Sequence, residues 1–164
     1  MFTDHTIETA PAASRRAMEA TRAKLGHVPT AVARLAESPH LLDGFLRMSG
    51  IFESTTLDMV SRETVIMTVA VRNGCEICVQ MHSAKLAEHP ELVTALRERA
   101  RLPDERLEAL RRFTIAVLET AGGVDDETLE DFLAHGYTKQ NALEVVLGIG
   151  TYTMSTLANR MTRS

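Results

Sequence analysis

Cys75 and Cys78 are the two cysteines of this 164-residue chain, and His82 follows the second of them by four positions. Two sulfurs three positions apart can close a small disulfide. A histidine four residues after a cysteine lies on the same helical face, within reach of the thiol, where it can accept the thiol proton. The spacing therefore predicts redox chemistry, with a nucleophilic thiol, a second thiol that resolves it and a proton acceptor in one place.

Asn73-Gly74 stands directly before this motif and predicts that one helix ends there and another begins at Cys75. Glycine tolerates the left-handed conformation that ends helices, and asparagine does so next best. At the start of a helix, the unpaired backbone N–H groups and the helix dipole favour a thiolate over a thiol. By dipole alone either cysteine can be the nucleophile, Cys75 at the expected exposed end or Cys78 one turn inside. His82 favours Cys78.

The rest of the chain must position these side chains, and its apolar residues recur at helical spacing almost throughout. No hairpin signal flanked by alternating apolar runs is present, so the expected fold class is all-α. Residues 65–71 resemble a buried strand, but the lack of any partner strand favours a helix there, with Asp58 or Ser61 as its N-cap. The core stripe of that helix is expected at Val60, Thr64, Met67 and Val71. Helices are expected over residues 12–25, 28–37, 39–52, 57–72, 75–89, 90–101, 103–121, 126–134 and 138–161.

The composition is that of a soluble globular protein, with 45% apolar residues, 24% charged residues and a net charge of -4. The charge argues against nucleic-acid binding, and the arginines of residues 97–112 alternate with acidic residues, which predicts a solvated helical face. We find neither a signal peptide in residues 1–18 nor an apolar run long enough to span a membrane. We expect one cytoplasmic domain over residues 1–164, with a core of about 24–121 and C-terminal helices at 126–161 for packing or oligomerisation.

Glu63 precedes Cys75 by twelve residues, and on one straight helix a rise of about 18 Å would keep the two apart. The break at Asn73-Gly74 allows one helix to fold onto the next. The order Glu63, eleven residues, Cys75, two residues, Cys78, three residues, His82 resembles the Glu-x11-Cys-x2-Cys-x3-His signature of AhpD-like alkylhydroperoxidases, in the carboxymuconolactone decarboxylase-like superfamily. The flanking sequences at residues 26–29 and 38–42 are also similar, and the resemblance covers about residues 24–90.

The resemblance implies an all-helical bundle, with a helical hairpin that carries the cysteine pair at a helix start. It also implies a homo-oligomer, often of trimeric units, that reduces peroxides without a cofactor or metal. By motif position, Cys78 corresponds to the peroxidatic cysteine, Cys75 to the resolving one, His82 to its proton partner and Glu63 to the carboxylate that anchors the relay. An external dithiol, a protein or a lipoyl-type group, would reduce the disulfide again.

One position departs from the family's pattern, because Ile77 stands where alkylhydroperoxidases have a histidine. A relay in this chain would then be incomplete, or would pass through Glu76, a water or another residue. The expected substrate is a peroxide, another small oxidant or a disulfide.

Three alternatives remain open at this stage. Cys75, Cys78 and His82 are three possible zinc ligands, with Glu63 or a water as the fourth. Glu63 and His82 can also serve as an acid–base pair, as in the decarboxylase branch of the superfamily, or the chain can be a non-catalytic helical interaction protein. The remaining histidines are expected to be structural or exposed, and Met48, Met67, Met81 and Met154 to pack in the core. Tyr152 and Asn159 on the final helix are compatible with a subunit contact.

Overall fold

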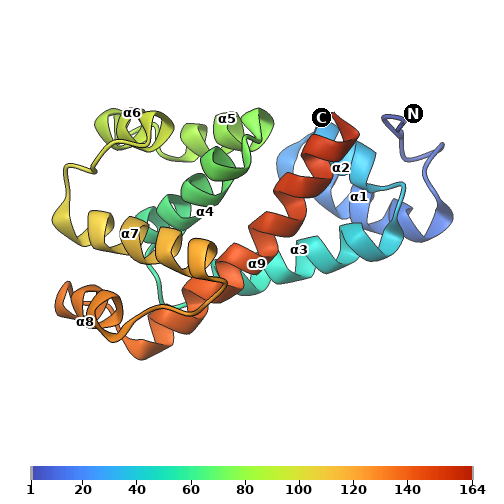
Figure 1. The fold of residues 1–164 in the computed structure, drawn as a ribbon. Coiled ribbons are helices and arrows are strands. Elements are labelled where there is room, and N and C mark those ends of the chain that lie inside the picture. The colour runs from blue at the N-terminus through green and yellow to red at the C-terminus, as the bar shows by residue number, and fades with distance from the viewer. Residues whose placement is uncertain (1, 164) are drawn as a thin grey trace.

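Helices make up all the regular structure of residues 2–163, the part of the chain that the computed structural model describes (Figure 1). The all-α prediction is therefore confirmed. None of the helices in this range is long and apolar enough to cross a membrane. In chain order they are α1 (Ala12–Leu25), α2 (Thr30–Leu35), α3 (Pro39–Glu53), α4 (Met59–Asn73), α5 (Glu76–Lys85), α6 (Pro90–Glu98), α7 (Glu105–Thr120), α8 (Asp126–Ala134) and α9 (Lys139–Thr162).

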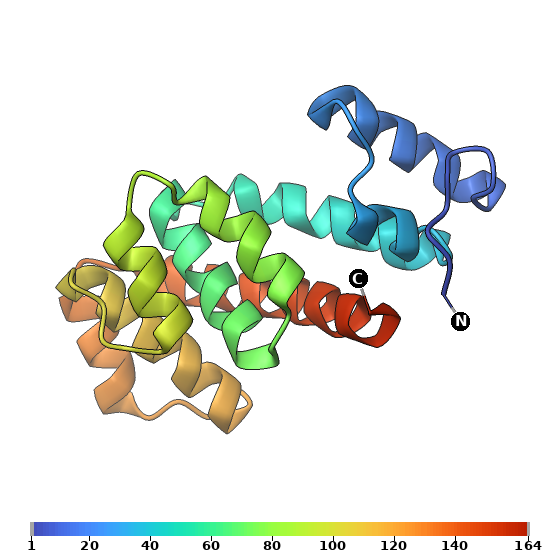
Figure 2. The same ribbon diagram turned by 90° about the horizontal axis from the view of Figure 1, so that it is seen from above.

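The long helix α9 crosses the molecule and packs against both α3 and α4 (Figure 1). Seen from above, α1 and α2 lie at one end of the molecule, near both chain termini, and α6, α7 and α8 lie at the other (Figure 2). Helix α5 packs against α4. The segment with the cysteine motif is thus held on a central framework of α4 and α9.

Local signals in the sequence explain where the central helices start and stop. The Asp58 carboxylate accepts a hydrogen bond from the Ser61 backbone N–H at 2.8 Å, so Asp58 is the N-cap of α4. Gly74 ends α4 in the left-handed conformation, with φ of 66°, as predicted. Thr138 and Asn141 form a reciprocal capping box at the start of α9.

Two predicted helix ends are wrong. Helix α5 ends at Lys85 rather than at residue 89, because Leu86 leaves the helical conformation with its side chain fully buried. Helix α6 ends at Glu98 rather than at residue 101, because Arg99 adopts a left-handed conformation with φ of 57°. Neither residue type signals a helix end, so only tertiary packing accounts for these two ends.

Helix α4 is buried almost all round, which explains why residues 65–71 resemble a strand. Every residue from Glu63 to Ala70 is buried, because α5, α6, α7 and α9 all pack around this helix. The predicted core stripe is too narrow: Thr64 and Met67 are buried as expected, whereas Val60 and Val71 are only partly buried. A one-sided stripe describes a surface helix, and α4 is not one.

The final helix has a buried polar face and an exposed apolar one. Tyr152 and Asn159 are buried within their own chain, so the expectation that they suit a subunit contact is wrong. The large apolar side chains that α9 exposes are instead Leu143, Val146, Leu157 and Met161. Met81, predicted to pack in the core, is also exposed.

The arginine-rich stretch is only partly the solvated face that was predicted. Arg101 and Glu105 form an exposed i,i+4 ion pair at 2.6 Å, as expected. Glu108 differs, because its carboxylate is buried and binds Arg111 at 2.7 Å as well as the backbone N–H of Leu102 at 3.0 Å. The hydrogen bond from Leu102 thus joins the buried carboxylate of α7 to the loop that precedes the helix.

Gly148 allows α9 to approach its neighbours closely. A Cβ atom at this position would lie 2.6 Å from the Phe52 ring of α3 and 3.2 Å from a methyl group of Val65 on α4. We expect Gly148→Ala to lower the free energy of unfolding by about 1–3 kcal/mol, because the core has no room for the methyl group.

Chemical denaturation measures this effect, and Gly150→Ala is the matched control on the same helix. A Cβ at Gly150 meets nothing within 4 Å, so alanine there is expected to stabilise the protein by up to about 1 kcal/mol through helix propensity. Equal effects of the two substitutions would contradict a tight contact at Gly148.

Candidate functional site

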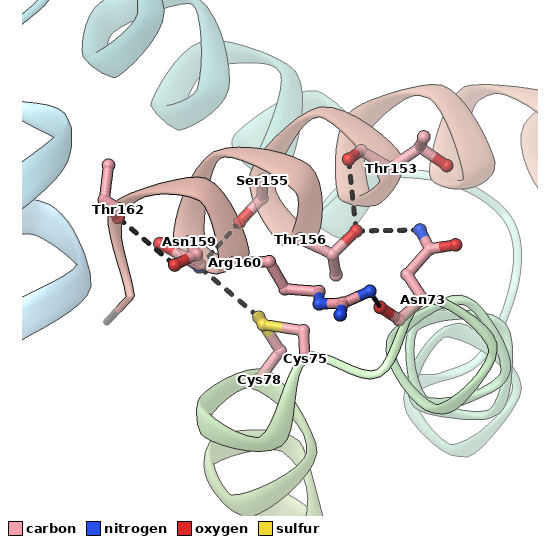
Figure 3. Close-up of a disulfide and its surroundings, with 9 residues drawn as sticks. All are labelled: Asn73, Cys75, Cys78, Thr153, Ser155, Thr156, Asn159, Arg160 and Thr162. Carbon is pink, nitrogen blue, oxygen red and sulfur yellow. Dashed lines mark hydrogen bonds between the residues drawn. A yellow bond between two sulfur atoms is a disulfide. The ribbon is translucent and has the colours of Figure 1, made fainter.

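Cys75 and Cys78 are joined by a disulfide at the start of α5, with their Cα atoms 5.4 Å apart (Figure 3). Cys75 is the N-cap residue of α5, and Cys78 lies in its first turn. The expectation that Cys75 is at an exposed end is wrong: it is 2% exposed and Cys78 is 6% exposed. Both pack in an apolar cluster with Met67 and Ala70 of α4. The structure therefore holds the pair in its oxidised form, largely shielded from solvent.

Glu63 and His82 meet across the interface of α4 and α5. The chain reverses at Gly74, α5 packs back on α4, and His82 Nδ1 lies 2.6 Å from Glu63 Oε2. Because a carboxylate only accepts, Nδ1 carries the hydrogen of this bond and Nε2 is left as the nitrogen that can exchange a proton. The carboxylate that is twelve residues from Cys75 in sequence is thus one hydrogen bond from the histidine that follows Cys78.

Lys85, which the sequence interpretation did not include, completes this cluster. Its Nζ lies 3.1 Å from Glu63 Oε1, so each carboxylate oxygen has a partner. Burial raises the pKa of Glu63, but the hydrogen bond and charge of His82, together with Lys85, outweigh burial and leave this pKa below its ordinary value. Glu63 is therefore ionised at neutral pH, a buried anion facing the imidazole.

Tyr152 of α9 fixes the plane of the imidazole. The rings of Tyr152 and His82 meet edge to face, with centroids 5.4 Å apart and planes at 88°. The Tyr152 hydroxyl lies 3.2 Å from Ser49 Oγ, and burial raises the pKa of Tyr152 to about 12. Tyr152 is thus a neutral phenol that restricts how His82 can rotate.

Asn159, also on α9, reaches the disulfide directly. Its Nδ2 donates a hydrogen bond to Cys78 Sγ at 3.3 Å (Figure 3). Next to it, Arg160 Nη1 donates to the backbone carbonyl of Asn73 at 2.7 Å, which brings a guanidinium to the turn before Cys75. Asn159 is 81 residues from Cys78 in sequence, so no local pattern could have pointed to it.

Glu76 and Ile77 lie between the cysteines, and their side chains contact other parts of the molecule. Glu76 binds Arg97 of α6 at 2.8 Å on the exposed side of α5, and Ile77 packs at the edge of the apolar cluster. Neither side chain has a hydrogen bond to His82. In residues 2–163, no three His, Cys, Asp or Glu side chains are arranged as possible metal ligands.

The family comparison agrees with this geometry. Residues 39–102, which include Glu63, Cys75, Cys78 and His82, match the model of the carboxymuconolactone decarboxylase family. The matched segment covers 64 of the 164 residues, from the start of α3 to the loop before α7. A comparison with curated protein sequences finds no match.

Solved structures share the AhpD-like fold over nearly the whole chain. An uncharacterised peroxidase-related protein from Ralstonia eutropha JMP134, described as an alkylhydroperoxidase AhpD core, is 20% identical with a TM-score of 0.84. A peroxidase-related protein from Silicibacter sp. TM1040 is also 20% identical, with a TM-score of 0.80. Each comparison covers 98% of this chain and 88% of the other.

A third similar structure has a different named activity. It is the debrominase Bmp8, as a cysteine-to-alanine variant in complex with 2,3,4-tribromopyrrole, with 16% identity and a TM-score of 0.75 over 100% of this chain and 90% of the other. At these identities the three structures establish the AhpD-like fold, and the fold is compatible with peroxidase-related or decarboxylase-like enzymes.

Proposed function

We propose that this protein is a thiol-dependent peroxidase of the AhpD type, with Cys78 as nucleophile, Cys75 as resolving thiol and Glu63–His82 as the proton relay. The observation that carries the proposal is the position of the Cys75–Cys78 disulfide on the same short helix as a histidine bound to a buried, ionised carboxylate. Such a site has a reversible two-electron carrier and an imidazole that can give or take a proton.

The proposed cycle starts from the reduced pair. The Cys78 thiolate attacks the hydroxyl oxygen of a hydroperoxide, the O–O bond breaks, and the alkoxide takes a proton from His82 to leave as an alcohol. The sulfur is now a sulfenic acid. The Cys75 thiolate attacks that sulfur, and the S–O bond breaks as hydroxide leaves, which takes up a proton to become water. The product is the disulfide that the structure contains.

A second substrate must return two electrons to the disulfide. We propose an external dithiol, on a protein or a lipoyl-type group, which reduces the pair by thiol–disulfide exchange and leaves as a disulfide. The pair is nearly buried, so exchange requires this donor to reach Cys75 or Cys78 through an opening of the site.

We also propose that the protein works as a homo-oligomer, with trimeric units as the expected form. Leu143, Val146, Leu157 and Met161 support this, because they expose large apolar side chains along one face of α9. Sedimentation velocity of the purified protein tests the assembly directly, and a monomer at micromolar concentration would contradict it.

Thiol counting tests the proposed activity. One equivalent of an organic hydroperoxide added to the fully reduced protein is expected to remove two free thiols per chain and to release one equivalent of the alcohol. Thiols that stay reduced under excess peroxide would contradict the proposal and favour a non-catalytic interaction protein. Metal analysis of protein purified without chelator distinguishes the zinc alternative, which requires about one equivalent of bound zinc.

A further inference from the structure

Asn159 touches the sulfur that the proposed function makes the nucleophile. Its side chain is buried, with the residue 3% exposed, and Nδ2 lies 3.3 Å from Cys78 Sγ and 3.4 Å from Ser155 Oγ. The orientation of the amide follows from chemistry, because a disulfide sulfur has no hydrogen and only the N–H side can bond to it. The donor end of Asn159 therefore points at Cys78.

The acceptor end of the same amide has no partner. Asn159 Oδ1 is buried, and no group within residues 2–163 forms a hydrogen bond with it. Buried polar atoms in proteins are nearly always paired, because an unpaired one loses its bonds to water without replacement. An unpaired acceptor beside a reactive sulfur is therefore a position that a ligand with an O–H group can fill.

We propose that Asn159 is a catalytic residue: its N–H stabilises the Cys78 thiolate, and its Oδ1 binds the O–H of the incoming hydroperoxide. This inference rests on the proposed peroxidase function and assigns a substrate-binding group to it. A neutral thiol has less to gain from an N–H donor than a thiolate does, so the contact favours the reactive form.

Asn159 Oδ1 can accept a hydrogen bond from the same O–H group before and after oxygen transfer. In the hydroperoxide, the attacked oxygen carries the hydrogen that would bind Asn159 Oδ1. When the S–O bond forms and the O–O bond breaks, that oxygen and its hydrogen move together onto Cys78 as sulfenic acid, while the departing alkoxide takes its proton from His82. Oδ1 thus holds one O–H through the step and gains or loses no proton.

Charged groups on every element around Cys78 act on its thiolate as well. Arg160 reaches the turn before α5 from α9, while Glu76 and Arg97 pair at the start of α5. Glu63, His82 and Lys85 form the cluster between α4 and α5. Substitution of Asn159 leaves all of these charges in place, so its effect is separable from theirs.

The experiment uses a Cys75→Ser background, in which Cys78 is the chain's one thiol, and iodoacetamide and an alkyl hydroperoxide as probes. Asn159→Leu is expected to slow alkylation of Cys78 at neutral pH about tenfold or more and to move its pH profile upward, because the donor to the thiolate is lost. Sulfenic acid formation is expected to slow further than alkylation, because Oδ1 is also lost.

Asn159→Asp separates the two roles and replaces the leucine variant if that one does not fold. An aspartate keeps an acceptor, loses the donor and adds a negative charge beside the thiolate, so alkylation and sulfenic acid formation are expected to slow by the same factor. Thr153→Val is the matched control, because Thr153 Oγ1 is another buried polar atom on α9 for which residues 2–163 provide no hydrogen-bond partner. It is expected to change neither rate.

The two readouts separate this inference from the proposed function. If alkylation of Cys78 in the folded Asn159 variants stays within twofold of the parent, the role of the N–H is overturned, whatever the peroxide does. If sulfenic acid formation in Asn159→Leu slows only as much as alkylation, the role of Oδ1 is overturned. If the parent protein does not react with peroxide, the proposed function fails, whereas a slowed alkylation still supports the thiolate contact.

Discussion

Cys78→Ser is expected to reduce peroxide turnover at least about a thousandfold, to the rate of the protein-free reaction, because a serine hydroxyl cannot replace the thiolate as nucleophile. Two features distinguish Cys78 from Cys75: the amide of Asn159 donates a hydrogen bond to its sulfur, and His82 lies one turn further along α5. Steady-state turnover with a dithiol donor measures the loss, and thiol titration should find Cys75 still reduced after peroxide is added.

Cys75→Ser is the matched control, because it removes the other sulfur of the same disulfide. This variant is expected to consume one equivalent of peroxide and then stop, with Cys78 held as a sulfenic acid that dimedone can trap. Full turnover in Cys78→Ser would contradict the assignment. Full activity towards a lactone or carboxylic acid substrate with both cysteines replaced would instead favour the acid–base alternative.

Glu63→Gln is expected to lower turnover about a hundredfold while His82 stays in place. Glutamine can still accept the hydrogen bond from His82 Nδ1, but it lacks the charge that stabilises protonated His82, the form that gives a proton to the leaving alkoxide. Steady-state turnover with a dithiol donor measures the loss. A turnover within twofold of wild type would contradict the relay.

Glu108→Gln is the control for loss of a buried carboxylate as such. Glu108 is also buried and bound to a cation, Arg111, but it lies on α7, away from the cysteine helix. Burial raises the pKa of Glu108, and its bonds to Arg111 and the Leu102 backbone lower it further than burial raises it. This variant is expected to be less stable than wild type and to keep its turnover.

The lowered pKa of Glu63 also makes the stability of the protein depend on pH. Because the pKa of Glu63 lies below its ordinary 4.5 in the folded protein, the stabilisation from its ionised form is complete above about pH 4.5. It is lost as the pH falls through the lowered value. Urea unfolding at neutral and acid pH should therefore show the Glu63→Gln variant destabilised near pH 7 and nearer to wild type in acid.

Much of the framework was predictable because it depends on local signals. Asp58, Gly74 and Thr138 act through bonds and conformations within a few residues, so sequence placed their helix ends well. The spacing of Glu63, Cys75, Cys78 and His82 was recognisable for a similar reason, since a single turn at Gly74 decides whether the four come together.

The rest of the site depends on contacts that sequence spacing does not encode. The packing of the helices decides that Lys85 contacts Glu63, that Tyr152 contacts His82 and that Asn159 contacts Cys78. Two of these residues, Tyr152 and Asn159, come from the last helix. The same cause made Met81 an incorrect core prediction: α5 has ten residues and little difference in polarity between its faces, so packing decides which side faces solvent. Helix periodicity predicts a face but not its partner.

The crossing of α9 over α4 and α5 has a consequence for protein engineering. A segment of residues 59–85 contains the whole recognisable motif. The side chains that contact His82 and Cys78 from outside this segment are Tyr152 and Asn159 of α9. Grafted onto another scaffold, that hairpin would keep its sulfur pair and its carboxylate but lose the contacts from α9. Transplanting the chemistry would require the last helix as well, in register, with a residue as small as Gly148 at the crossing.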